Sequence, residues 1–144
     1  MMRAKPLSGT SGFTLIEVLI TLVIFAVGIL GLALMQLSAI RGNSVANRLT
    51  EASNIATDQI EQMFNWDYND NRLEGSTNAT YNLINGANQI ADGHRLDARG
   101  NYDIIWNIQE NTPAAGSKTV DITVIWFDRG QRKELTFSTI KAAP

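Results

Sequence analysis

The chain has 144 residues, enough for one folded domain and an additional segment. Charged residues make up 18% of it and the formal net charge is −2. This weakly acidic balance argues against a nucleic-acid binder, which would present a basic surface. Because there is no cysteine, an exported domain would have to fold without a disulfide.

The first recognisable element is a long apolar segment. Arg3 and Lys5 precede it, Arg41 follows it, and the 23 residues from Val18 to Ile40 carry no charge. As an α-helix these residues would span about 34 Å, enough to cross a hydrocarbon core of about 30 Å. Two cations before the segment against one after it favour a cytoplasmic N-terminus and an exported C-terminal part.

Glu17 is the one charge within this apolar region. A carboxylate in hydrocarbon costs about 2.5–3.5 kcal/mol on insertion scales. A plain membrane anchor therefore accounts for the length of the segment but not for Glu17. A cleaved secretory signal peptide is disfavoured as well, because its apolar region would run for only about 7–15 residues before a small-residue cleavage site.

The stretch Gly12-Phe13-Thr14-Leu15-Ile16-Glu17 resembles the processing and N-methylation motif of type IV pilins and of type II secretion pseudopilins. The resemblance implies that a membrane prepilin peptidase cuts between Gly12 and Phe13 and then methylates Phe13. It also implies that Glu17 neutralises the new amine, in the same subunit or in the next, and thereby sets the register of assembly.

The resemblance extends to AVGILGLALMQ at 26–36 and VDITVIWFDRGQRKELTFSTI at 120–140, which are similar to the PilV group of minor pilins. It implies three regions, namely a cleaved leader (1–12), a transmembrane or filament-core helix (13–40) and a periplasmic pilin-like domain (41–144).

The implied function is structural: a minor pilin that helps to prime and assemble a type IV pilus, in a tip complex. The implied partners are major and minor pilins, the prepilin peptidase, the inner-membrane assembly platform and, before assembly, membrane lipid. No enzymatic activity, cofactor, metal or nucleic acid is expected. Two alternatives stay open, a minor pseudopilin of type II secretion and a membrane-tethered binding module such as an adhesin or DNA receptor.

Gly28 and Gly31 lie within the apolar segment, although glycine weakens a helix by about 1 kcal/mol relative to alanine. By resemblance to pilins, the pair would let the helix extend on entering a filament. The alternative is close helix–helix approach through small residues.

Beyond Ile40 the apolar residues recur at steps of three to five as far as Phe64, which is typical of an amphipathic helix. The sequence therefore predicts one helix from about Phe13 to Phe64. From Asn65 to Gly100 the chain is rich in Asn, Asp and Gly and is predicted to be mostly loop, with a short strand or a helical turn near Thr80–Ile84.

Three strands are predicted after Gly100: Tyr102–Ile108, a strand over 119–126, and Lys133–Ile140, with a hairpin turn at Asp128–Gln131. The middle strand alternates so that one face is apolar, and Leu135 and Phe137 of the last strand face one way. The fold class is therefore α+β, with the amphipathic half of the helix covering a small antiparallel sheet, and the family resemblance implies a type IV pilin-like fold. The apolar face of the middle strand consists of Val120, Ile122, Val124 and Trp126.

Several weaker patterns favour structural roles. The calcium-loop start at Asp67–Asn71 lacks the glycine and final glutamate that such a loop needs. The tripeptide Asn78-Ala79-Thr80 fits a glycosylation acceptor by its pattern alone. His94 is the only histidine, and the chain has no cysteine nucleophile. A Ser-His-Asp site would have to use His94 in a predicted glycine-rich loop, and such a site is disfavoured. Arg129, Arg132 and Lys133 are read as a solvated turn, and the three tryptophans, Trp66, Trp106 and Trp126, as core residues.

Overall fold

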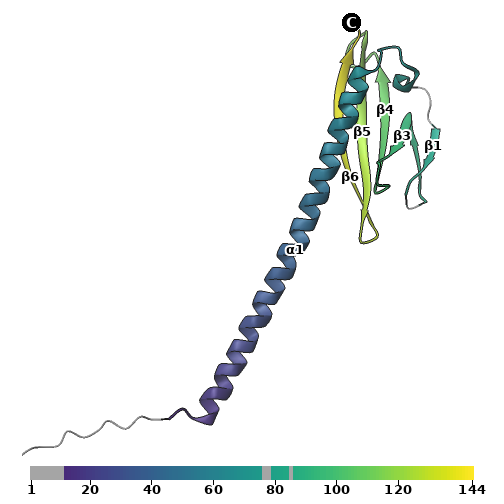
Figure 1. Ribbon diagram of the computed structural model, residues 1–144. Helices are drawn as coiled ribbons and strands as arrows, with labels where there is room; N and C mark the ends of the chain where they lie inside the picture. Colours follow the sequence, from purple (N-terminus) through teal and green to yellow (C-terminus); the bar gives the residue numbers. More distant parts are fainter. Residues whose placement is uncertain (1–11, 76–78, 85) are drawn as a thin grey trace, which may run out of the picture. The chain divides into compact units, whose positions relative to one another are not determined.

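The computed structural model describes residues 12–75, 79–84 and 86–144. Residues 1–11 of the predicted leader and Asn78 of the predicted glycosylation tripeptide lie outside them. The chain divides into two compact units, one ending at Ser44 and one running from Val45 to Pro144. The elements in chain order are α1 (Leu15–Asn65), the 3₁₀ turn η1 (Asn71–Leu73), β1 (Ala79–Asn82), β2 (Asn88–Ala91), β3 (Gly93–Leu96), β4 (Tyr102–Glu110), β5 (Ser117–Asp128) and β6 (Gln131–Ala142) (Figure 1).

Helix α1 confirms the predicted long helix, beginning at Leu15 and ending at Asn65. Four of its residues are buried, and their spacing of four, three and four places them on one side of the helix. They are Ala52, Ala56, Gln59 and Met63. The small side chains of Ala52 and Ala56 let this part of α1 lie close against the sheet (Figure 1).

The main sheet has the order β3-β4-β5-β6, and all its neighbours are antiparallel. The register pairs Tyr102 with Trp126 and Trp106 with Ile122, and most of the buried apolar side chains of β4 and β5 lie on the face that packs against α1. The predicted apolar face is confirmed: Val120, Ile122, Val124 and Trp126 are all buried. Leu135 and Phe137 of β6 extend the same face and are partly buried there.

The opposite face of the sheet also carries a core, which was not predicted. Ile105 of β4 and Ile125 of β5 are buried there. They pack with Ala91 of β2 and with Leu83, which directly follows β1. The prediction of a single apolar face was therefore incomplete, because a second layer covers part of the other side.

The same layer corrects the prediction for residues 65–100. This region was expected to be mostly loop, but it contains β1, β2 and β3. The short strand predicted near Thr80–Ile84 corresponds to β1. The other two strands, Asn-Gln-Ile-Ala and Gly-His-Arg-Leu, have four residues each and too few β-branched or aromatic side chains to give a strand pattern.

A glycine explains how β3 fits beside β4. Gly93 pairs with Trp106, and a β-carbon at Gly93 would overlap the indole ring. The prediction that the tryptophans belong to the core is confirmed for Trp106 and Trp126, which are buried. Trp66 is partly buried against the same core, with its ring centroid 6.2 Å from that of Trp106.

Lys141 of β6 closes the end of α1. Its Nζ donates hydrogen bonds to the carbonyl oxygens of Met63 (2.8 Å) and Phe64 (3.2 Å), and also to that of Trp66. The last carbonyls of a helix lack intrahelical partners and form the negative end of its dipole. The buried ammonium group of Lys141 therefore donates hydrogen bonds to these carbonyls and places a positive charge at the negative end of the dipole.

Lys141→Met is expected to lower the free energy of unfolding by about 1–2 kcal/mol, since it keeps the apolar stem but removes the charge from the helix end. Urea unfolding of a fragment covering 45–144 measures the change. Lys133→Met is the matched control, because Lys133 is exposed on the same strand. Equal stability of the two variants would show that the helix end gains nothing from Lys141.

The turn between β3 and β4 is organised by Asp97. Its carboxylate accepts hydrogen bonds from the backbone N–H groups of Arg99 (3.0 Å), Asn101 (2.6 Å) and Tyr102 (2.7 Å). Burial is the largest single influence and raises the pKa of Asp97, but these hydrogen bonds together outweigh it, so that the pKa lies below its usual value.

Because the folded-state pKa of Asp97 is lowered, its stabilising effect is present above the pKa of the unfolded chain and disappears as the pH falls through the folded-state value. We therefore expect Asp97→Asn to cost about 1 kcal/mol of unfolding free energy at neutral pH. The cost should shrink towards zero on acidification. Unfolding curves across the acid range measure this, with Asp58→Asn on the exposed side of α1 as the control. A pH-independent difference would contradict the expectation.

Candidate processing and assembly site

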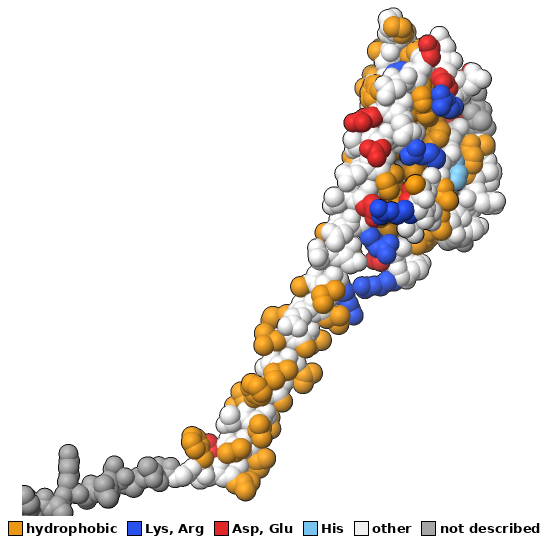
Figure 2. All heavy atoms as spheres, in the orientation of Figure 1, with side chains coloured by type: hydrophobic (Ala, Val, Ile, Leu, Met, Phe, Trp, Pro, Cys, Tyr) orange, Lys and Arg blue, Asp and Glu red, His pale blue; other side chains and the backbone are white. Residues whose placement is uncertain are grey.

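The first half of α1 is an exposed apolar surface. Phe13 is 83% exposed, and the large apolar side chains from Leu15 to Ile40 are exposed as well (Figure 2). Within the described residues, α1 is the one helix whose length and apolar composition suffice to cross a membrane. Such a surface requires lipid or other apolar helices around it, and the apolar helix fits membrane anchoring.

The helix begins with an N-cap at Thr14. The backbone N–H of Glu17 donates to the Thr14 hydroxyl (3.3 Å) and to its carbonyl oxygen (3.1 Å), and the N–H of Val18 donates to the same carbonyl (3.3 Å). Thr14 and Glu17 thus have the spacing of a capping box, in which Ser or Thr is followed three residues later by Glu or Gln. This cap was not predicted, although the Thr-x-x-Glu spacing would have indicated it.

Gly12 and Phe13, directly before the cap, are exposed. Phe13 lines a surface recess together with Val18, an arrangement typical of the hydrophobic staple that fixes the chain before a helix. A β-carbon at Gly12 would meet no other atom within 4 Å. The Gly12–Phe13 bond therefore lies outside the helix, where a peptidase would have room to bind it.

Glu17 occupies the first turn of α1 and is exposed. Among the described residues its carboxylate has no ion pair and no side-chain hydrogen bond. The adjacent Ile16 and Val18 are apolar and exposed. The positive end of the helix dipole favours this carboxylate by about 0.3–1 kcal/mol at an exposed site. In an apolar environment this carboxylate would need a partner from outside the described chain.

Gly28 and Gly31 both lie inside the continuous helix. A β-carbon at either position would meet no atom within 4 Å, so packing within the described chain does not require glycine. Both predicted roles, helix extension in a filament and close approach of another helix, therefore stay predictions.

The weaker candidates serve the fold. His94 Nε2 lies 2.9 Å from Oδ1 of Asp103, a fully buried carboxylate whose Oδ2 accepts a hydrogen bond from the N–H of Ile84 (2.8 Å). Asp67 and Asp70 accept backbone N–H bonds within their own turns. Within the described residues, no three His, Cys, Asp or Glu side chains are grouped so that they could hold a metal ion.

The predicted turn at Asp128–Gln131 is present. Arg129 and Gly130 have positive φ angles of 51° and 78°, which is typical of a tight hairpin turn. Of the cations gathered there, Arg132 pairs with Glu134 at 2.8 Å. These charges therefore form the solvated turn that was expected.

Residues 7–33 match the family described as the prokaryotic N-terminal methylation motif. No curated protein matches the chain. No solved structure matches it either. The motif is the type IV pilin-like prepilin signal, and it supports membership of the pilins and pseudopilins. These are structural subunits rather than enzymes, and the motif implies assembly partners of the same family.

Proposed function

We propose that this chain is a minor pilin of the PilV group, which enters a type IV pilus by its N-terminal helix and helps to prime assembly within a tip complex. The observation that carries the proposal is the carboxylate of Glu17, which has no ion pair among the described residues, in the first turn of an exposed apolar helix, five residues after Gly12. The motif match over residues 7–33, which includes both residues, supports the same assignment.

The proposed sequence of events begins in the inner membrane, with the N-terminus in the cytoplasm and the domain from residue 41 onward in the periplasm. The prepilin peptidase removes residues 1–12 and methylates Phe13. The new amine is cationic and lies beside the N-cap, at the positive end of the helix dipole, which disfavours it there. A carboxylate from Glu17 of the same or the neighbouring subunit offsets that charge.

In the filament, packed apolar helices exclude water, so that an unpaired charge costs several kcal/mol. A neighbour shifted to the wrong height would leave both an amine and a carboxylate unpaired. The pair between Phe13 and Glu17 would therefore fix the register of the incoming helix, as buried polar groups fix register in coiled coils. Major and minor pilins and the inner-membrane assembly platform are the partners in this step.

Processing tests the first step. We expect the chain isolated from its native host to begin at methylated Phe13, as intact-mass measurement would show. Gly12→Val should leave the leader attached, because a branched side chain replaces hydrogen next to the bond that is cut. Thr10→Ala, within the same leader, is the control and should be processed normally. A mature chain that begins near residue 40 would instead indicate a secretory signal peptide.

Filament incorporation tests the proposal as a whole. An epitope-tagged full chain is expected in sheared pili, labelled at filament ends in electron micrographs, and in pull-downs with other minor pilins. Deletion of the gene should reduce the number of pili. Normal piliation with a loss of protein secretion would assign the chain to a type II pseudopilus. A processed chain that never enters filaments would indicate a membrane-tethered binding module.

A further inference from the structure

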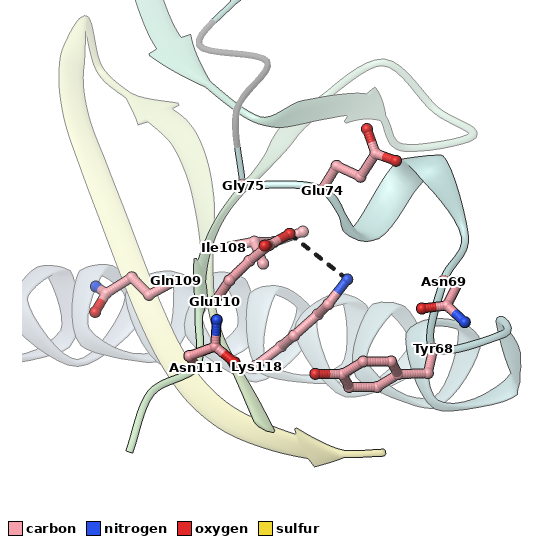
Figure 3. A pocket seen from close by; sticks show the side chains of 9 residues that line it. All are labelled: Tyr68, Asn69, Glu74, Gly75, Ile108, Gln109, Glu110, Asn111 and Lys118. Carbon is pink, nitrogen blue, oxygen red and sulfur yellow. Dashed lines mark ion pairs between the residues drawn. The ribbon is translucent and has the colours of Figure 1, made fainter. Parts of the chain in front are cut away.

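A polar recess of about 800 Å³ lies where the loop after α1 faces the ends of β4 and β5 (Figure 3). Small-molecule sites in proteins usually measure about 300–1,000 Å³. All the residues that line the recess belong to the unit from Val45 to Pro144. None of them takes part in the processing or assembly site described above.

Lys118 provides a fixed centre on one wall. Its side chain is only 8% exposed, and its Nζ donates a hydrogen bond to the carbonyl oxygen of Leu73 (2.8 Å). The same Nζ lies 3.7 Å from a carboxylate oxygen of Glu110 and 4.8 Å from the centre of the Tyr68 ring. Figure 3 shows the ammonium group between Glu110 and Tyr68. These contacts hold the Glu110 side of the recess in place before any ligand arrives.

The loop wall is held equally firmly. A β-carbon at Gly75 would overlap the carbonyl oxygen of Ile108, so the loop backbone lies directly against β4. Asn69 and Glu74 line the recess from this loop, and Asn111 lines it from the end of β4. Their amide and carboxylate groups provide both hydrogen-bond donors and acceptors around one space.

The chemistry of these walls points to one class of ligand. An apolar ligand would desolvate the amides and carboxylates without compensating hydrogen bonds. An anion would find the ammonium group of Lys118, the one cation among the described residues of the lining, already paired with Glu110. A metal ion would need a denser set of oxygen ligands than two glutamates and amides provide. A hydroxyl group both donates and accepts, and therefore matches a wall of mixed amides and carboxylates.

We propose that this recess binds neutral carbohydrate. Its place on the domain agrees with this use. The recess lies beyond the C-terminal end of α1, about 30 Å along the helix from Val45 at 1.5 Å per residue. It is therefore at the opposite end of the domain from the point where the apolar segment joins it. The inference does not depend on the filament role.

The test uses the full chain in a zwitterionic detergent without a sugar headgroup, because maltoside or glucoside detergents would compete for the recess. The fluorophore-labelled chain is applied to an array of neutral and anionic oligosaccharides, and the affinity for the best neutral ligand is measured by titration. Asn69→Ala should weaken binding about tenfold by loss of one hydrogen bond to the ligand, and Glu110→Gln should weaken it by about as much, because a neutral amide accepts a weaker hydrogen bond from a hydroxyl than a carboxylate does. Asn107→Ala and Glu134→Gln are matched controls outside the recess and should bind normally.

Three results would overturn the inference: no binding to any neutral oligosaccharide, binding only to anionic ones, or recess variants that bind as well as the controls. Calcium titrated in place of sugar should give no binding, and a calcium signal lost in Glu110→Gln would reassign the recess to a cation. Melting temperatures of all four variants separate lost binding from unfolding. A negative result leaves filament incorporation untouched, and a chain that never enters filaments can still bind sugar.

Discussion

Trp126→Ala is expected to lower the free energy of unfolding by about 3–5 kcal/mol, the usual cost of truncating a large aromatic side chain in a core. Trp126 is 5% exposed and lies on the face of β5 that packs against α1. Its ring pairs with that of Tyr102, their centroids 6.0 Å apart. Tyr102 in turn donates a hydrogen bond to Glu51 of α1 (2.9 Å). The cavity would therefore open where the helix is joined to the sheet.

Urea unfolding of the 45–144 fragment, followed by far-ultraviolet circular dichroism, measures the loss. Ile140→Ala is the control, since Ile140 is an apolar residue of β6 that is 53% exposed and lies outside both cores. We expect its effect to stay within about 0.5 kcal/mol. If the two substitutions cost the same, the packing of α1 on this face of the sheet contributes little to stability.

The elements with strong periodicity could be predicted from the sequence. The apolar run and the steps of three to five residues indicate α1 almost to its last residue. The alternation from Val120 to Trp126 indicates both β5 and the face that it buries. In these segments the side-chain pattern and the tertiary environment agree, because the same apolar residues that form the pattern fill the core.

The β1–β2 layer could not be predicted, because its strands are short and owe their burial to partners distant in sequence. By alternation Ile125 was expected to face solvent. It is buried because the β1–β2 layer covers that face of the main sheet. Asp103 interrupts an apolar strand, and this interruption is the one feature of the sequence that indicates a buried polar residue there. Its partner His94 could not be identified without the pairing of β3 with β4, and its partner Ile84 could not be identified without the layer that contains β1.

Two lysines show the same limit. Lys118 shares the strand face of Val120, and Lys141 that of Phe137, yet a lysine charge suggests exposure; both side chains are buried. Each donates to backbone carbonyl oxygens of the loop or helix end that precedes the sheet. Lysine is rarely buried unless its charge is compensated, and here the compensation comes from backbone groups that have no sequence signature.

The N-terminal motif allows two explanations of Glu17 that a single set of variants separates. In a complete capping box the Glu17 side chain would accept a hydrogen bond from the Thr14 N–H and support the start of α1, and glutamine would serve that purpose as well as glutamate. As the partner of the Phe13 amine, the side chain must carry a negative charge. Glu17→Leu removes both properties, Glu17→Gln keeps the cap without the charge, and Glu17→Asp keeps the charge at shorter reach.

We expect Glu17→Gln and Glu17→Leu to be exported and cleaved, yet to enter filaments at least about tenfold less than the parent chain, because the incoming Phe13 amine would be buried without a carboxylate. Glu17→Asp should be intermediate. The measurement is the ratio of filament-associated to processed chain, with pili counted in each strain. Thr14→Ala, which removes the capping hydroxyl and keeps the charge, is the matched control and should be incorporated nearly normally. Normal incorporation of Glu17→Gln together with poor incorporation of Thr14→Ala would show that capping, and not charge pairing, is the reason for Glu17. Normal incorporation of Glu17→Leu would refute both explanations and leave α1 as a plain membrane anchor.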